Sequence, residues 1–134
     1  MEPYTLNDGE GRSYLWYNFL FTMKAGPSET GAFAVMDFAT RKGGEPPEHV
    51  HEGEDELFYI LDGNLTFTCG DKSFDVGPRG FIFLPRDISH SFTIHSEGLA
   101  RMLVLTHPDQ FGQAIETTGQ GLSAEEVANR IIAS

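Results

Sequence analysis

The segment GGEPPEHVHEGEDELFYILDG, residues 43–63, places two histidines and a carboxylate beside a run of strand-forming residues. His49 and His51 are two residues apart, and alternate side chains of an extended strand point to the same face, so both imidazoles project together. Glu56 then opens the run ELFYIL, whose β-branched and aromatic residues are typical of a strand, and the strand ends in the turn Asp62-Gly63. The segment therefore predicts a pair of imidazoles next to a carboxylate at the start of a strand.

A third imidazole follows much later in the chain. His90 lies in LPRDISHSF, where a proline-containing turn leads into another short strand. Three imidazoles and one carboxylate suit a divalent transition metal such as Fe, Mn, Ni, Co, Cu or Zn. A single strand histidine is more often a half-buried side chain than a ligand. Four polar groups that converge among Phe and Ile are costly to bury without an ion, so we expect His49, His51, Glu56 and His90 to bind a metal.

Neighbouring acids compete with Glu56 for the role of the fourth ligand. Glu52, Glu54 and Asp55 precede it directly, and such acids are usually part of a solvated loop. Glu56 is the preferred ligand because it leads straight into the strand.

The remaining histidines and the cysteine lack such a setting. His95 lies off the inward register and His107 lies at a strand end, which makes a ligand or proton-shuttle role the less favoured interpretation. Cys69 is interpreted as a packed small residue, since no basic residue near it in sequence forms an activating pair.

The first motif of the cupin family is matched by these residues. It reads G, five residues, H-x-H, three or four residues, E, six residues, G, and Gly43, His49, His51, Glu56 and Gly63 fill every position. The chain therefore resembles the cupin family over roughly residues 30 to 107, and the motif is specific.

The second cupin motif is matched only in part. It reads G, five residues, P-x-G, two residues, H, three residues, N, and Pro85 and His90 match. Gly80 is one residue too close to the proline, Asp87 replaces a glycine and Ile94 replaces the asparagine. These departures affect turn and structural positions rather than the ligand, and Asp adopts unusual backbone angles less freely than Gly.

The resemblance implies a fold, an assembly and a chemistry. The fold is the cupin double-stranded β-helix, a jelly-roll barrel, and the assembly is a homodimer formed by strand exchange or sheet packing. The sequence is most similar to small single-domain cupins of the quercetin dioxygenase type. In that group the enolate or phenolate oxygen of the substrate binds the metal, O2 attacks the activated ring, and the ligand carboxylate, here Glu56, takes up the proton as general base.

We therefore expect a metal-dependent dioxygenase that acts on a small aromatic or enolisable molecule. Two alternatives stay open, because one scaffold supports many chemistries. The first is a metal-dependent lyase, isomerase or epimerase that consumes no O2, and the second is a non-catalytic module that binds a small molecule or sugar.

Period-two alternation and turn residues predict an all-β protein with short C-terminal helices. Residues 14–23, YLWYNFLFTM, are interpreted as one extended strand. Further strands are expected at 31–39, 56–61, 64–69, 72–76, 80–84, 90–94 and 100–106. Helical spacing predicts helices at 109–117 and 123–133, and Ser123 with Glu126 forms the capping-box pattern of the second.

The same alternation of side chains predicts which residues line the site. Phe58 and Ile60 share a face with Glu56, and Phe92 and Ile94 share a face with His90. We expect these four side chains to line a substrate pocket that suits an aromatic or otherwise hydrophobic ligand with a chelating pair of oxygens.

Composition agrees with one small domain over residues 1–134, with a core at about 14–107 and a helical tail at about 108–134. The formal charge of −11 disfavours nucleic acid and anionic lipid surfaces as partners. A single cysteine excludes an intrachain disulfide, and the acidic start MEPYTLNDGEGRS lacks the pattern of a secretion signal. No apolar run approaches a membrane span. These features favour a cytoplasmic protein with a small-molecule substrate.

Overall fold

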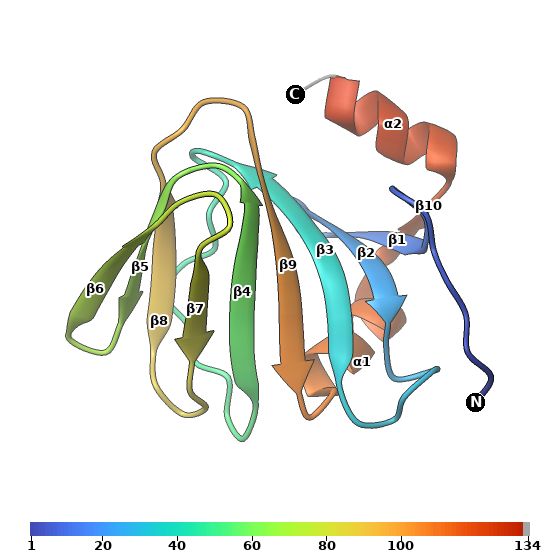
Figure 1. The fold of residues 1–134 in the computed structure, drawn as a ribbon, viewed down its shortest axis with the longest axis horizontal. Helices are drawn as coiled ribbons and strands as arrows, with labels where there is room; N and C mark the ends of the chain where they lie inside the picture. The colour runs from blue at the N-terminus through green and yellow to red at the C-terminus, as the bar shows by residue number, and fades with distance from the viewer. Residues whose placement is uncertain (133–134) are drawn as a thin grey trace.

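Two antiparallel β-sheets form a jelly roll, as predicted, in the computed structural model of residues 1–132 (Figure 1). The larger sheet has the order β10-β1-β2-β3-β9-β4-β7 and the smaller the order β6-β5-β8. The elements are β1 Arg12–Trp16, β2 Phe19–Ala25, β3 Ala34–Arg41, β4 Asp55–Asp62, β5 Leu65–Cys69, β6 Lys72–Val76, β7 Phe81–Leu84, β8 His90–Ile94, β9 Leu99–His107, α1 Gln110–Thr118, β10 Gln120–Leu122 and α2 Ala124–Ile132. Neither helix is long and apolar enough to cross a membrane, and the structure describes no other helix.

The core lies between the inner faces of the two sheets. Phe58 of β4, Phe67 of β5 and Phe92 of β8 are buried, and their ring centroids lie 5.2 to 6.3 Å apart. On the other side of the core, Phe21 of β2 stacks on Phe38 of β3 at 4.7 Å. Burial of such rings is the main favourable term for the fold, and strict alternation keeps each ring on the inner face.

The interpretation of residues 14–23 as one strand was wrong. The chain turns at Tyr17 and Asn18, so β1 and β2 form a hairpin in which Trp16 pairs with Phe19. Tyr17 has φ 56°, the left-handed backbone that two-residue hairpin turns require. Aromatic residues continue through the turn and no glycine marks it. The alternation of side chains therefore predicted one continuous strand. Both turn residues, Tyr17 and Asn18, line a cavity of about 710 Å³.

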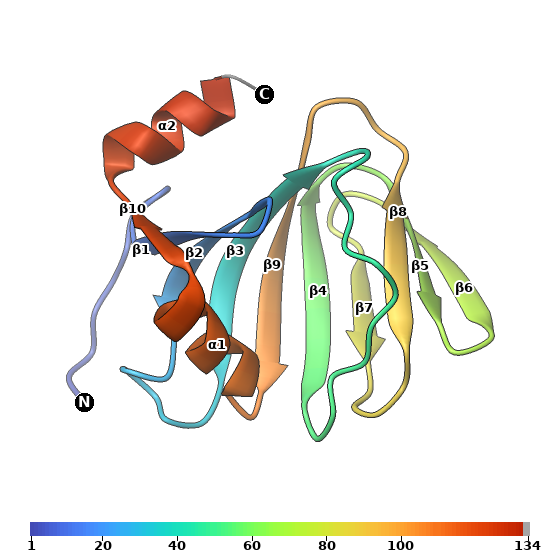
Figure 2. The same cartoon turned by 180° about the vertical axis from the view of Figure 1, so that it is seen from behind.

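The segment that bears His49 and His51 is less regular than predicted. It is an extended connection from β3 to β4 that runs beside β8 (Figure 2), and a single bridge, between His49 and His90, replaces a full ladder. Glu45 anchors the connection, because its carboxylate accepts hydrogen bonds from Ile94 N at 2.9 Å and Gly43 N at 2.6 Å.

The C-terminal region contains the two predicted helices and one strand that was not predicted. The Ser123–Glu126 capping box is confirmed, since Glu126 N donates to Ser123 Oγ and Ser123 N donates to Glu126 Oε1. Ala133, included in the predicted second helix, lies outside the described residues. β10 pairs with β1, and α1 packs against β1 and β9.

Candidate metal centre

Three segments bring the four predicted ligands together. His49 and His51 come from the β3–β4 connection, Glu56 from the start of β4 and His90 from the start of β8. One candidate ligand atom from each residue lies within 4.8 Å of all the others. Two donors on opposite sides of one ion, each about 2.1 Å from it, are separated by about 4.2 Å. The cluster is therefore close to the size that a single ion requires.

Backbone hydrogen bonds hold two ligands directly opposite each other. His49 N donates to His90 O at 3.0 Å, and His90 N donates to His49 O at 2.8 Å. Their ring centroids lie 4.5 Å apart, while the rings of His51 and His90 are nearly parallel at 5.4 Å. A two-way bridge of this kind fixes the separation of the two rings without a long strand.

The Nδ1 atoms of His49 and His51 contact groups outside the four-residue cluster. His49 Nδ1 lies 2.8 Å from Pro47 O, a carbonyl that can only accept, so this nitrogen carries the proton. His51 Nδ1 lies 3.2 Å from Glu54 Oε1. In each ring the Nε2 atom is therefore the one with a lone pair for a metal.

The other two candidate ligands, Glu56 and His90, are buried, and the His90 ring finds no hydrogen-bond partner among the residues that the structure describes. Glu56 Oε1 lies 3.2 Å from His90 Nε2, and Glu56 Oε2 lies 3.8 Å from His51 Nε2. The first pair does not have hydrogen-bond geometry, so within residues 1–132 both ring nitrogens of His90 are buried without a hydrogen-bond partner. Unpaired buried nitrogens are costly. A cation between the imidazoles and the carboxylate would bind one of the two His90 nitrogens, and this donor set fits a divalent transition metal.

The electrostatic environment of His49 differs from that of His51. Burial lowers the pKa of His49 below its ordinary value, and the charges of His90 and His51 lower it further. Burial acts the same way on His51, but the hydrogen bond with Glu54 and the negative charges of Glu56 and Glu54 outweigh it and raise its pKa. His49 is thus held in the neutral form that a metal ligand requires.

The competing acids take other positions. Glu52 belongs to an exposed turn, and Asp55 faces outward and pairs with Arg86 at 3.1 Å. Glu54 is buried next to the cluster, where it contacts His51 rather than joining the four ligands. Of these acids, the structure brings only Glu56 into the candidate metal group.

The other two histidines lie apart from the cluster. His95 is exposed, and its Nε2 lies 2.7 Å from Thr66 Oγ1. His107 is exposed at the end of β9. Cys69 is a free, partly buried residue that packs against the core.

Asp87 replaces the motif glycine and takes the conformation of one. Its φ is 67°, in the left-handed region that Asp tolerates better than most residues. Asp87 N donates to His51 O at 3.0 Å, and Asp87 Oδ1 accepts from Gly53 N at 2.8 Å. The substitution thus ties the turn before His90 to the segment that carries His51.

The cluster lies at a cavity of about 710 Å³ with largely aromatic walls. Phe58 and Phe92, two of the four residues expected to line a substrate pocket, line this cavity. Ile60 and Ile94 share the inward face but are fully buried in the core and are absent from the cavity lining. Alternation therefore identified the face on which these residues lie, but not how deep each one lies.

The sequence did not distinguish which of the other aromatic residues line the cavity and which belong to the core. The rest of the aromatic wall comes from the β1–β2 hairpin, β3 and α1, which are distant in sequence from the ligands. The residues are Trp16, Tyr17, Phe19, Phe21, Phe38 and Phe111. The density of aromatic residues in the stretch 14–23 was the available signal, but it does not show toward which site the rings point.

Comparison with known proteins decides the family. A sequence model described as the cupin domain matches residues 36–106, which include all four candidate ligands. The chain belongs to the cupin family. Its fold, its motif residues and its His-His-Glu-His cluster now have one common explanation.

Relatives of this cupin differ in their described activities. Quercetin 2,3-dioxygenase from Bacillus subtilis is 30% identical over 118 residues, which cover 87% of this chain and 35% of that protein. The chain thus spans about a third of the length of this relative. A predicted oxalate decarboxylase from Thermotoga maritima has a TM-score of 0.70 at 18% identity, with 78% of this chain and 99% of that one covered. KdgF from Halomonas sp. has a TM-score of 0.69 at 14% identity, with 83% and 99% covered. At such identities the two structures show the fold alone.

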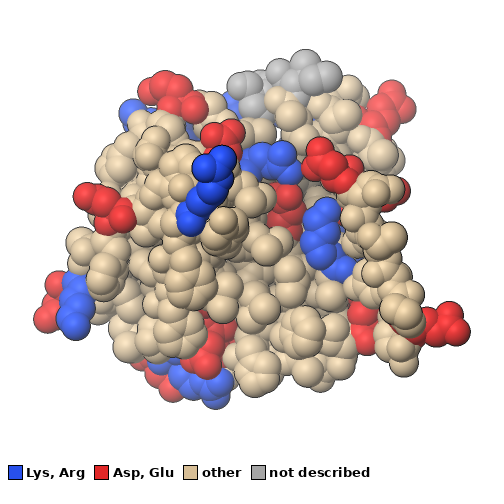
Figure 3. Space-filling model, in the orientation of Figure 1, with Lys and Arg blue, Asp and Glu red and all other residues tan. Residues whose placement is uncertain are grey.

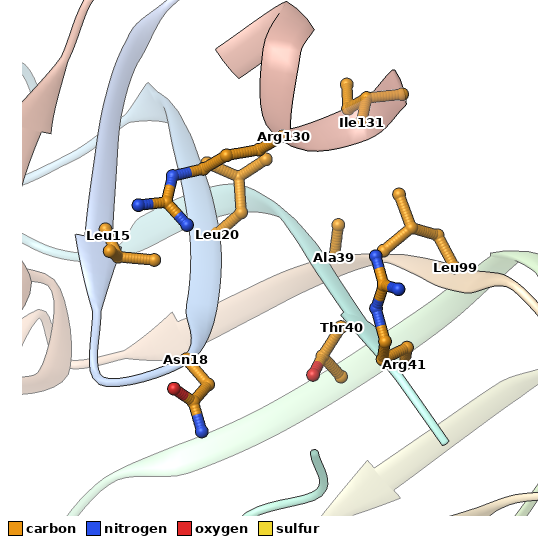
Figure 4. A pocket seen from close by; sticks show the side chains of 9 residues that line it. All are labelled: Leu15, Asn18, Leu20, Ala39, Thr40, Arg41, Leu99, Arg130 and Ile131. Atoms are coloured by element: carbon orange, nitrogen blue, oxygen red, sulfur yellow. The ribbon is translucent and has the colours of Figure 1, made fainter. Parts of the chain in front are cut away.

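A second cavity of this cupin, about 270 Å³, lies between α2 and the larger sheet (Figure 4). Arg41 and Arg130 enter it from two sides, and its lining includes no histidine or acid. Of the residues that line it, only Asn18 also lines the aromatic cavity. Its lining contains none of the four candidate metal ligands.

Proposed function

We propose that this cupin is a metal-dependent dioxygenase that acts on a small aromatic or enolisable substrate. The observation that carries the proposal is one buried carboxylate, Glu56, among three imidazoles at an aromatic cavity. The similarity to a quercetin 2,3-dioxygenase over 87% of the chain supports this reaction class over others on the same scaffold.

The ligand residues have distinct proposed roles. His49, His51 and His90 offer imidazole nitrogens, and Glu56 offers the negative charge. A divalent transition metal held by these four residues would supply Lewis acidity toward a substrate oxygen. Glu56 accepts the proton of the substrate hydroxyl, because it is the one carboxylate of the cluster and is buried where water competes poorly.

The cavity walls select and orient the substrate in this proposal. A volume of about 710 Å³ is within the range of small-molecule sites, roughly 300 to 1,000 Å³. Phe38 and Phe92 lie near the ligands with ring centroids 6.2 Å apart, and Trp16 and Phe111 contact each other edge to face at 5.3 Å. Such surfaces favour a flat aromatic molecule and exclude water from the proton acceptor.

Oxygen consumption tests the proposal. Protein loaded separately with Fe, Mn, Ni or Co is incubated with flavonols, 1,3-diketones and catechols in an oxygen electrode. We expect substrate-dependent O2 uptake with at least one metal form. Absence of uptake across all forms contradicts the proposal. Turnover without O2 indicates the lyase, isomerase or epimerase alternative, and a ligand-induced rise in melting temperature without turnover indicates a binding module.

We also propose that two copies of the chain associate through the outer face of β4, β7 and β9. Cross-strand pairs place Tyr59 beside Phe81 and Leu103, and Leu57 beside Phe83. Figure 3 shows mainly uncharged surface over these strands, with charged groups around it. Tyr59, Phe81 and Phe83 are 37%, 58% and 49% exposed, on the order of 300 Å² in all. That is a suitable centre for an interface of about 800 Å² per partner.

Replacing Phe81 by Glu is therefore expected to convert a dimer into a monomer. In a two-fold interface the substitution places two buried charges near each other. Light scattering during size-exclusion chromatography measures the mass. Leu6→Glu is the control, since Leu6 is exposed on the N-terminal segment beyond the opposite edge of the sheet (Figure 1). A wild-type monomer at all concentrations, or a Phe81→Glu dimer, contradicts this interface.

A further inference from the structure

Glu54 is a buried carboxylate whose two oxygens connect two distant parts of the chain. Only 2% of the residue is exposed. Oε1 lies 3.2 Å from His51 Nδ1, and Oε2 accepts a hydrogen bond from Phe111 N at 3.0 Å. A buried carboxylate is retained only where its oxygens are paired, so both contacts are needed to stabilise it.

The second contact lies at the start of α1. The helix has no acidic residue in its first turn, and the side chain of the N-cap residue Asp109 makes no capping hydrogen bond. Asp109 Oδ1 accepts instead from Gln113 Nε2 at 3.0 Å. Glu54 therefore supplies, from another segment, the acceptor and the negative charge that a helix N-terminus requires.

The same end of the helix also packs on the metal ligand. The ring of Phe111 contacts the ring of His51 edge to face, with centroids 5.1 Å apart. Glu54 therefore contacts His51 at Nδ1, and the Phe111 ring packs against the imidazole ring of His51. α1 begins at Gln110, beyond the matched cupin domain at 36–106, so the contacts that Phe111 makes come from outside the matched region.

We propose that Glu54 is a positioning residue that couples docking of α1 to metal binding at His51. The inference rests on the metal site of the proposed function. When Nδ1–H of His51 donates to Glu54, Nε2 is left as the donor toward the cluster, and the ring cannot rotate freely. Binding energies of linked sites are reciprocal, so an ion that orders His51 also stabilises the start of α1, and a docked α1 raises metal affinity.

Metal titration of variants tests the first half of the coupling. Co²⁺ is added to metal-stripped protein in a calorimeter without substrate. Glu54→Ala is expected to lower Co²⁺ affinity by about 10- to 100-fold, the usual effect of losing an outer-shell partner. Glu54→Gln keeps the size of the side chain, but its single amide oxygen replaces only one acceptor, so a smaller loss is expected. Glu52→Gln, an exposed acid of the same loop, is the matched control and should bind like wild type.

Hydrogen exchange of residues 110–118 tests the second half. Metal-free Glu54→Gln and Glu54→Ala should exchange faster at the start of α1 than wild type, and Co²⁺ should slow exchange there in wild type but much less in the variants. Should Glu54→Gln bind Co²⁺ as tightly as wild type, or should α1 exchange be the same with and without Co²⁺ in wild type, the coupling is refuted. Neither readout uses turnover, so loss of the dioxygenase proposal is a separate result.

Discussion

Replacing Glu56 by Gln is expected to abolish turnover while the fold persists. Gln has the shape of Glu but neither its charge nor a site that takes up a proton, and loss of a general base alone lowers rates by about 10²- to 10⁴-fold. Metal affinity should fall as well, because a neutral amide replaces the one anionic ligand. Oxygen uptake measures the first effect and calorimetric metal titration the second.

The neighbouring acids provide the controls for this experiment. Glu52→Gln changes an exposed acid and should leave both quantities unchanged. Glu54→Gln should weaken metal binding less than Glu56→Gln, because Glu54 acts through His51. A larger effect for Glu54→Gln than for Glu56→Gln contradicts the assignment of Glu56 as the ligand.

Replacing His49 and His51 together by Ala is expected to leave a folded barrel that binds no metal. The bridge between His49 and His90 is made by backbone atoms, which the substitution keeps, and neither His49 nor His51 belongs to the core of buried aromatic and aliphatic residues, so that core stays intact. Wild type should gain about 2.7 kcal/mol of unfolding free energy when free metal is 100-fold above the dissociation constant, and the variant should gain none.

Thermal unfolding with and without added metal measures this difference. His95→Ala and His107→Ala are matched controls, since both remove exposed imidazoles outside the cluster and should keep the metal-dependent stabilisation. A double variant that is stabilised by metal as strongly as wild type shows that the ion binds elsewhere.

The sequence was most informative where the structure is local and periodic. The spacing of His49, His51 and Glu56 predicted three candidate ligands that the structure brings together, because an extended backbone fixes which side chains share a face. The same alternation located β4 through β9 to within one or two residues. His90 could be added because it opens a short strand behind a turn, as the family motif requires.

Features that depend on tertiary contacts were missed. The turn at Tyr17 carries no glycine, so nothing local showed that β1 and β2 fold back. Glu54 was weighed as a rival ligand, because sequence spacing does not reveal that its partner is the start of α1. Ile60 and Ile94 were placed on the inward face, but both are buried in the core and do not line the cavity, since alternation contains no information on depth.

Elemental analysis of protein purified without chelators tests the central claim most directly. The claim is that His49, His51, Glu56 and His90 form one metal site, and it predicts about one equivalent of a divalent transition metal per chain, or uptake of one equivalent on addition. The His49→Ala/His51→Ala protein should contain almost none. Wild-type protein that is free of transition metal and takes up none, or a double variant with full metal content, contradicts the claim.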